Sequence, residues 1–382
     1  MKHTKKIIFR QTDRQTDRQT DRHYGIDFLR IVSMFLVVIL HILGQGGILK
    51  GVQTEGRFAI TWFMEIVAYC AVDCYALISG FVGFSEKPKA HKYSRWILLW
   101  MQVVFYCMLI TLILYFILPG KIGFKAFVKA IMPVSFNNYW YFTAYTGVFI
   151  FIPWFNKLLQ NTGKRELKSL ILWMIVIFSF YPTAVSIIND PFHLVRGYSF
   201  LWLAILYVLG AYIRKYDVYK EIKKNMLLMV GMILLLFTWI WKLGIGRFFV
   251  SKLAIEDMFI SYISPTILGF AIILLILFAQ MNIKIRARKW IKFIAPSAFG
   301  VYLIHTHPLL FEYVLKGRFT VIAELSAWLI PIVVLGLAAL IFIGGILIDK
   351  IRKVIFETCR LNLLAQEIEN WGRKIAKRFS KE

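Results

Sequence analysis

Arg30 and His41 stand eleven residues apart in an apolar stretch of the sequence. An α-helix turns by ~100° per residue, so both side chains would lie on one helix face, ~16 Å apart along its axis. Histidine is suited to taking a proton from an attacking group, because its ordinary pKa lies nearest physiological pH. Ionisable side chains inside a membrane span are costly and usually mark a substrate or proton path. We therefore predict that His41 is catalytic, with Arg30 and Asp27 on the same stripe.

Asp73 and Ser79 form a second group of candidate catalytic residues, in another apolar segment. An acid at the middle of a span is costly unless it is paired or neutral, and we expect His41 or an arginine to be the partner of Asp73. Ser79 is a candidate donor to a developing oxyanion. The pair Ser79-Gly80 could equally serve close helix packing, which is the usual reason for small residues in a membrane helix.

Lys92 and Arg95 lie in a short basic segment between two apolar stretches. They could hold phosphate groups, Arg with its planar fork and Lys as a point charge. The alternative is that they only follow the rule that cytoplasmic loops of membrane proteins are rich in Lys and Arg.

Aromatic residues and a further histidine are the candidates for binding a substrate. Tyr139, Trp140 and Tyr141 could stack on the ring of a substrate, although an aromatic belt at the membrane surface explains them almost as well. His305 is a candidate from a third apolar segment. We expect no metal site and no disulfide, because no Cys-x-x-Cys or His-rich spacing accompanies the four cysteines.

The composition determines what must position these residues. Of the 382 residues, 59% are hydrophobic, and the mean hydropathy is +0.65. Such a chain is too apolar for a water-soluble domain, and in lipid its backbone polar groups must pair within helices. We predict an all-α, polytopic bundle of about ten transmembrane helices. The predicted spans are residues 31–49, 60–84, 96–118, 139–155, 169–188, 198–213, 225–243, 259–280, 294–315 and 321–348.

The net charge of +25 follows the membrane topology and does not indicate nucleic-acid binding. If both termini are cytoplasmic, 35 of the 46 Lys and Arg residues fall in cytoplasmic segments. This asymmetry is typical of cytoplasmic loops and predicts that orientation. The first 25 residues are charged and do not resemble a cleavable signal peptide, so we expect a multi-pass protein of the plasma membrane.

Three regions follow from these patterns. Residues 1–25 contain the repeat Gln-Thr-Asp-Arg three times and predict a disordered cytoplasmic tail. Residues 26–348 form the transmembrane domain that carries the candidate chemistry. Residues 349–382 predict a basic, amphipathic helix on the inner leaflet, where anionic membrane lipids would be its partners.

Four strings in this order resemble the acyltransferase 3 family, the bacterial integral membrane acyltransferases that modify surface and secreted glycans. Together they extend over most of the chain. They are Ile26-Asp27-x-Leu29-Arg30 with His41; Val72-Asp73-x-x-x-x-Ile78-Ser79-Gly80-Phe81; Tyr139-Trp140-Tyr141-Phe142 followed by Pro153-x-x-Asn156; and Phe299-Gly300-Val301-Tyr302-Leu303-Ile304-His305.

The resemblance implies that His41 is the essential catalytic histidine and that Arg30 is its partner near the acyl donor. It also implies a cytoplasmic Arg-x-x-Arg that engages coenzyme A, which here reads Lys92-Tyr93-Ser94-Arg95. Lysine keeps the charge of the first Arg but loses the bidentate fork. Some relatives carry an extracytoplasmic esterase-like domain. None follows here, so we expect direct acylation of the acceptor or transfer to a separate extracytoplasmic partner.

The resulting hypothesis is a membrane O-acyltransferase of surface polysaccharide or cell-wall glycan. It would use cytosolic acyl-CoA, most simply acetyl-CoA, as a co-substrate with no permanently bound cofactor, and a hydroxyl of an extracytoplasmic or lipid-linked glycan as acceptor. His41 would be a general base or a transient acyl carrier. The alternative is an exporter or flippase of a polysaccharide or its lipid-linked precursor. The absence of internal sequence symmetry counts against that alternative.

Overall fold

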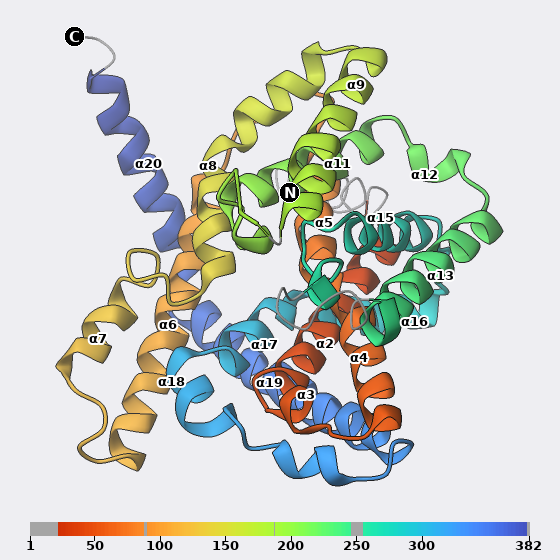
Figure 1. The fold of residues 1–382 in the computed structure, drawn as a ribbon. Coiled ribbons are helices and arrows are strands. Elements are labelled where there is room, and N and C mark those ends of the chain that lie inside the picture. Colours follow the sequence, from red (N-terminus) through yellow and green to blue (C-terminus); the bar gives the residue numbers. More distant parts are fainter. Residues whose placement is uncertain (1–21, 88–89, 187, 246–254, 380–382) are drawn as a thin grey trace.

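A computed structural model describes residues 22–87, 90–186, 188–245 and 255–379, and over these residues the protein is a bundle of helices without a β-strand (Figure 1). This confirms the predicted all-α fold. The predicted tail of residues 1–25 lies almost entirely outside the described residues. The principal helices are α2 (Tyr24–Leu43), α4 (Glu55–Tyr69), α5 (Ala71–Gly83), α6 (Tyr93–Ile117), α8 (Trp140–Asn161), α9 (Lys164–Ile175), α11 (Phe200–Lys215), α13 (Lys224–Ile240), α15 (Pro265–Ala279), α16 (Ile285–Ile294), α17 (Ala298–His305), α19 (Leu329–Thr358) and α20 (Leu361–Phe379).

Shorter helices connect or extend these. The α-helical ones are α3 (Ile48–Gly51), α7 (Phe124–Ile131), α10 (Tyr181–Val185), α12 (Val218–Glu221) and α18 (Pro308–Leu310). The π-helical turns are η1 (Val176–Phe180), η3 (Trp241–Ile245) and η6 (Phe311–Leu315), and the 3₁₀ turns are η2 (Val195–Gly197), η4 (Ile255–Asp257), η5 (Ala295–Ser297) and η7 (Thr320–Glu324).

Six helical segments of the described chain are long and apolar enough to cross a membrane. The 22-residue helix α8 and the shorter helices α11 and α15 occupy other predicted spans. The protein is therefore a polytopic membrane protein. The six segments are Tyr24–Leu43, Glu55–Gly83, Tyr93–Ile117, Lys164–Val185, Lys224–Gly244 and Leu329–Thr358.

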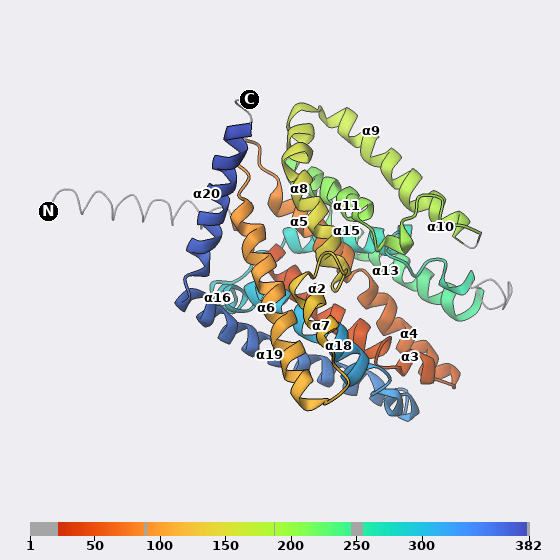
Figure 2. The same cartoon turned by 90° about the vertical axis from the view of Figure 1, so that its left-hand side faces the viewer.

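Helix α2 lies in the middle of the bundle, where it packs against α4, α5, α15, α17 and α19 (Figures 1 and 2). The helix begins at Tyr24, whereas the predicted span began at residue 31. The difference arises because Asp27 pairs with Arg22 and Arg30, so that charged residues are accommodated in the first turns. The helix ends at Leu43, before the glycine-rich turn in which Gly47 adopts a left-handed φ of +92°.

The predicted span at residues 294–315 is not one continuous helix. α17 ends at His305, and Pro308 begins the short helix α18. Proline cannot donate a backbone hydrogen bond and clashes with the preceding turn, which explains the break. The ring of His307 caps the new start by accepting a hydrogen bond from the Leu309 amide at 3.2 Å. The interruption places His305 at a helix end in the interior of the protein.

Helices α5 and α11 cross at close range through two glycines. A Cβ atom on Gly80 would overlap the carbonyl oxygen of Tyr207, and a Cβ atom on Gly210 would overlap that of Leu77. Close backbone approach through small residues is typical of membrane helix contacts. Asn156 of α8 joins this crossing, because it donates to the Gly83 carbonyl and accepts from the Tyr207 hydroxyl. The Pro153-x-x-Asn156 string thus has a structural role.

The chain ends in two helices that meet near Arg360. α19 continues to Thr358, so the element boundary lies after the predicted end at residue 348. α20 then lies across the first turn of α6 (Figure 2). α20 falls within the segment 349–382 that the sequence predicts to lie on the inner leaflet, and several of its apolar side chains are exposed, including Leu363, Ile368 and Trp371.

Candidate active site

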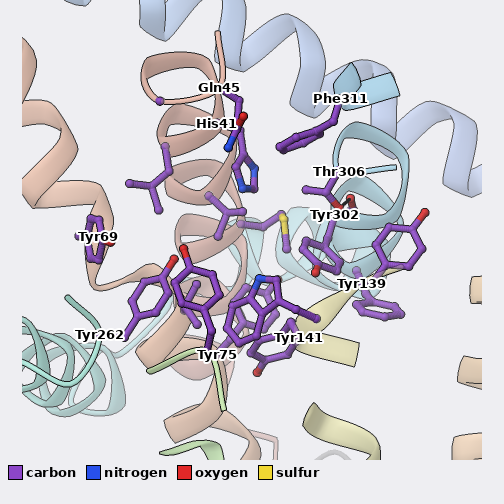
Figure 3. A pocket seen from close by; sticks show the side chains of 18 of the residues that line it. His41, Gln45, Tyr69, Tyr75, Tyr139, Tyr141, Tyr262, Tyr302, Thr306 and Phe311 are labelled. Atoms are coloured by element: carbon purple, nitrogen blue, oxygen red, sulfur yellow. Dashed lines mark hydrogen bonds between the residues drawn. The ribbon is translucent and has the colours of Figure 1, made fainter. Parts of the chain in front are cut away.

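A cavity of about 310 Å³ lies beside the second half of α2 and is walled mainly by aromatic side chains (Figure 3). Its volume falls at the lower end of the range for small-molecule sites. His41 lies toward the end that carries Gln45, and Tyr75, Tyr141 and Tyr262 lie toward the other (Figure 3). Two lining residues, Gln45 and Tyr198, are exposed on the protein surface, so the cavity opens beyond the end of α2.

His41 is paired with a second histidine from the broken helix segment. Its Nδ1 atom lies 2.9 Å from Nε2 of His305. On its other side, Nδ1 of His305 lies 2.6 Å from the carbonyl oxygen of Val301. A carbonyl oxygen can only accept a hydrogen bond, so His305 Nδ1 must carry a proton and donate it.

The tautomer of His41 follows from this arrangement. With Nδ1 protonated, neutral His305 has a lone pair on Nε2, and His41 must donate to it from Nδ1. A neutral His41 then has its own lone pair on Nε2. No described residue hydrogen-bonds to that atom, and His41 lines the cavity, where its ring packs edge-on against Phe311. His41 is therefore held in the form that can take a proton.

The four predicted substrate-binding residues divide into two groups. Tyr139, Trp140 and Tyr141 all line the cavity. The Tyr139 hydroxyl is already used, because it donates to the Leu303 carbonyl at 2.8 Å and thereby fixes α17. His305 does not line the cavity, and its contact is with His41. The structure thus places it behind His41, with no direct access to a substrate.

Asp73 does not pair with His41 or with an arginine, as the sequence had suggested. Its Oδ1 atom accepts a hydrogen bond from the indole of Trp202 at 3.0 Å, and its Oδ2 atom is buried without a partner. The close crossing of α5 and α11 brings the two residues together. Asp73 is fully buried and does not line the cavity, although Val72 beside it does.

Ser79 does not line the cavity itself, although its side chain lies beside Tyr141 of the cavity wall. Its hydroxyl donates to the Tyr75 carbonyl at 3.0 Å, one turn earlier in α5. Such back-bonding within the helix satisfies a serine hydroxyl locally. The cavity residue with a free hydroxyl in this region is Tyr75, whose buried oxygen has no hydrogen-bond partner among the described residues.

Comparison with protein families identifies the chain. The family model of the acyltransferase domain, acyltransferase 3, matches residues 23–350. This chain belongs to the acyltransferase 3 family. No curated protein and no solved structure gave a significant match. The matched residues include the whole of the cavity wall and the His41–His305 pair, so the protein is a membrane acyltransferase whose bundle carries the family domain.

The predicted donor-binding residues of the acyltransferase approach the cavity from the opposite end of α2. Arg30 donates to Asp27 at 3.0 Å and is 29% exposed at its side chain. Both Arg30 and Arg95 lie within electrostatic reach of Tyr145. The Tyr145 ring stacks on that of Tyr141, a residue of the cavity wall. Two of the three predicted cations thus lie near Tyr145, which contacts the cavity wall through Tyr141.

Lys92, the third, is exposed just before the first turn of α6. Nothing in the structure brings its ammonium group to the cavity. Lys92 lies three residues before Arg95, in the segment that the sequence predicts to be cytoplasmic.

Further cations of the acyltransferase gather at the start of α2, which the sequence did not indicate. Arg288 and Lys292 of α16 lie over the ring of Tyr24, at 5.1 and 5.7 Å from its centroid. Arg22 lies over the same ring at 5.5 Å. The four-residue spacing of Arg288 and Lys292 could have indicated a basic helix face. It could not have shown that this face packs beside α2.

The C-terminal helix of the acyltransferase closes over the Lys92–Arg95 segment. Glu369 accepts a hydrogen bond from the Ser94 amide at 2.9 Å, and Arg373 donates to the His91 carbonyl at 2.7 Å. Burial opposes ionisation of Glu369, but the hydrogen bonds from Ser94 and Arg373 outweigh it and lower its pKa to about 2. For His91, partial burial is the main cause of a lowered pKa, against the charge of Glu369, which raises it.

Proposed function

We propose that this acyltransferase moves an acetyl group from cytosolic acetyl-CoA to a hydroxyl of an extracytoplasmic or lipid-linked glycan. The observation that carries the proposal is the free Nε2 lone pair of His41 inside an aromatic cavity. With the orientation that the charge distribution predicts, Arg30 lies near the cytosol and the cavity opens to the outside. Donor and acceptor would then reach His41 from opposite sides of the membrane.

The donor path follows α2. The phosphates of coenzyme A would lie among Arg30, Arg95 and the exposed Lys92, which supply charge for them. The pantetheine arm would extend along the ~16 Å between Arg30 and His41, past Tyr145 and Tyr141. This length is the reason that the thioester, and not the nucleotide, would reach the cavity.

The reaction needs one base and one donor to the thioester oxygen. His41 Nε2 takes the proton of the acceptor hydroxyl while the hydroxyl oxygen forms a bond to the thioester carbonyl carbon. The tetrahedral intermediate then breaks its carbon–sulfur bond, and the sulfur leaves with the electron pair and takes the proton from the imidazolium. The products are an O-acetyl ester and free coenzyme A.

His305 and Tyr75 support these steps. His305 accepts from Nδ1 of His41, which keeps the imidazole oriented and stabilises the imidazolium once it forms. The unpaired hydroxyl of Tyr75 is the candidate donor to the oxyanion, the role that the sequence had suggested for Ser79.

Acceptor binding would rely on the aromatic wall. Trp140 lies against Tyr198 and Tyr262, and such faces suit the apolar C–H surfaces of a sugar ring. The glycan class and the plasma membrane as location remain parts of this proposal. The family assignment favours this chemistry over the exporter or flippase that the sequence left open, because a carrier needs no acyl donor.

The test uses purified protein in lipid nanodiscs with acetyl-CoA labelled in the acetyl group and with lipid-linked glycan from membranes of the producing cells as the acceptor. We expect release of free coenzyme A in the wild type and its loss in His41→Ala. His193→Asn is the matched control, since His193 is exposed away from the cavity and its left-handed φ of +49° suits asparagine. An inert thioester in the wild type would contradict the proposal and favour the exporter.

A further inference from the structure

We propose that Glu65 anchors the acceptor sugar through hydrogen bonds from its hydroxyl groups, and that the cavity therefore selects neutral over acidic sugars. This inference rests on the proposed function and names its substrate class. It concerns a residue to which the sequence motifs give no role.

Glu65 is a buried acid without a partner. It lies in the last turns of α4, is 7% exposed and lines the cavity that contains His41. Its Oε2 atom is buried with no hydrogen-bond partner, and no ion pair of Glu65 exists among the described residues. A buried polar group left unpaired is costly, so this carboxyl group is suited to a ligand that completes its hydrogen bonds.

The surroundings of Glu65 fit a ring with both polar and apolar faces. Tyr69 follows one turn later on the same helix face and packs against Tyr262 at 4.9 Å between ring centroids. Trp140 stacks on Tyr262 at 6.1 Å. All four residues line the cavity. A sugar lying on these rings would present its edge hydroxyls to the carboxyl oxygens.

The wall of the cavity offers no counter-charge to an anionic ligand at Glu65. No lysine or arginine is among the described residues that line it. Arg196 is the cation that acts on Tyr69, but its guanidinium group donates to the carbonyl groups of Asp257 and Ile260. A carboxylate or phosphate on the acceptor would therefore lose its hydration beside Glu65 without gaining a counter-charge. Neutral hydroxyls carry no such penalty.

The first test measures binding without catalysis. Purified protein in nanodiscs is treated with dicyclohexylcarbodiimide, and mass spectrometry follows modification at Glu65 and, for reference, at the exposed Glu55. Neutral aryl glycosides of glucose, galactose, mannose, rhamnose and N-acetylglucosamine are added as protecting probes, with glucuronide, galacturonide and glucosaminide as charged counterparts.

We expect at least one neutral glycoside to protect Glu65 and not Glu55, and the acidic glycosides to give no protection. Lack of protection by every neutral glycoside would contradict the proposal, as would lack of reaction at Glu65, because a carboxyl group that faces the cavity must be accessible. Stronger protection by the cationic glucosaminide would also overturn it, because Glu65 would then be an ammonium site.

The second test separates binding from turnover. With the protecting glycoside as acceptor, Glu65→Ala should raise its KM about ten- to hundredfold with a smaller change in kcat, as expected for a buried ligand hydroxyl left without its hydrogen-bond partner. Glu65→Gln should have an intermediate effect, and Glu55→Gln, at the exposed start of α4, is the matched control. An unchanged KM in Glu65→Ala would contradict the proposal.

The two proposals fail in different ways. If the proposed acyl transfer is wrong, the wild type leaves acetyl-CoA intact, whatever the glycosides do at Glu65. If only the role of Glu65 is wrong, coenzyme A release still depends on His41, while protection and the KM effect are missing.

Discussion

Nδ1 of His41 and Nε2 of His305 lie 2.9 Å apart, although 264 residues separate them in the sequence. The Val301 carbonyl fixes the proton of His305, and His305 in turn fixes that of His41. As a result, the lone pair on Nε2 of His41 is left free in the cavity. This arrangement is similar to a catalytic triad in which a histidine and a backbone carbonyl replace the acid.

His305→Ala should lower kcat about 10²- to 10⁴-fold, because His41 would lose the acceptor that sets its tautomer. His305→Gln should retain more activity, since its side-chain oxygen can accept from Nδ1 of His41. Coenzyme A release by the purified variants measures both.

The double variant tests whether the two histidines act as one unit. His41→Ala with His305→Ala should be no slower than His41→Ala alone, because effects within one catalytic unit do not add. Additive losses would show that His305 acts independently of His41.

Arg30→Ala and Arg95→Ala should each raise the KM for acetyl-CoA about tenfold, the effect of one charge-assisted hydrogen bond. Lys92→Arg restores the fork of the family motif and should lower that KM. Initial rates at varied acetyl-CoA give these values, with Lys50→Ala on the other side of the bundle as control. Equal KM values for acetyl-CoA in all four variants would contradict the proposed path of the donor along α2.

Gly80→Ala should destabilise the protein by ~1–3 kcal/mol or more, because its Cβ atom would overlap the Tyr207 backbone. Gly336→Ala is the matched control: nothing lies within 4 Å of its Cβ position, and alanine is the better helix former. Thermal unfolding in detergent measures both. Equal melting temperatures would contradict the close crossing of α5 and α11.

The contact of α20 with α6 should weaken in acid. The pKa of Glu369 is lowered to about 2 from the ordinary 4.5, so its ionised form stabilises the contact. This contribution is complete above pH 4.5 and is lost as the pH falls toward 2. Hydrogen exchange of α20 should rise over that range in the wild type. In Glu369→Gln it should be faster already at neutral pH and change less, and a parallel pH profile would refute this assignment.

The sequence predicted most of the fold because apolar length alone specifies membrane helices. The predicted helix boundaries were wrong where local interactions override hydropathy. The charged pair Asp27 and Arg30 lies inside α2, since each neutralises the other. Pro308 interrupts an otherwise apolar segment, and that interruption is what places His305 beside His41.

The candidate site was harder to predict, because helix periodicity places residues on a face but does not say which faces meet. His41 and the aromatic residues from 139 to 141 line one cavity, while their catalytic and substrate-binding roles stay predictions. The partner predicted for Asp73 was wrong. Its partner is Trp202, which comes from a helix whose contact with α5 depends on Gly80 and Gly210. Glu65 lies within the predicted span 60–84, but its lack of a partner is visible only in three dimensions.

The central claim is that acyl transfer depends on the unprotonated Nε2 atom of His41. Its most direct measurement is the O-acetyl content of surface glycan from cells that contain wild type or His41→Ala at equal membrane level, read by mass spectrometry. The account predicts that the acetyl mass increment disappears in His41→Ala and persists in His193→Asn. Undiminished acetylation in His41→Ala would contradict it.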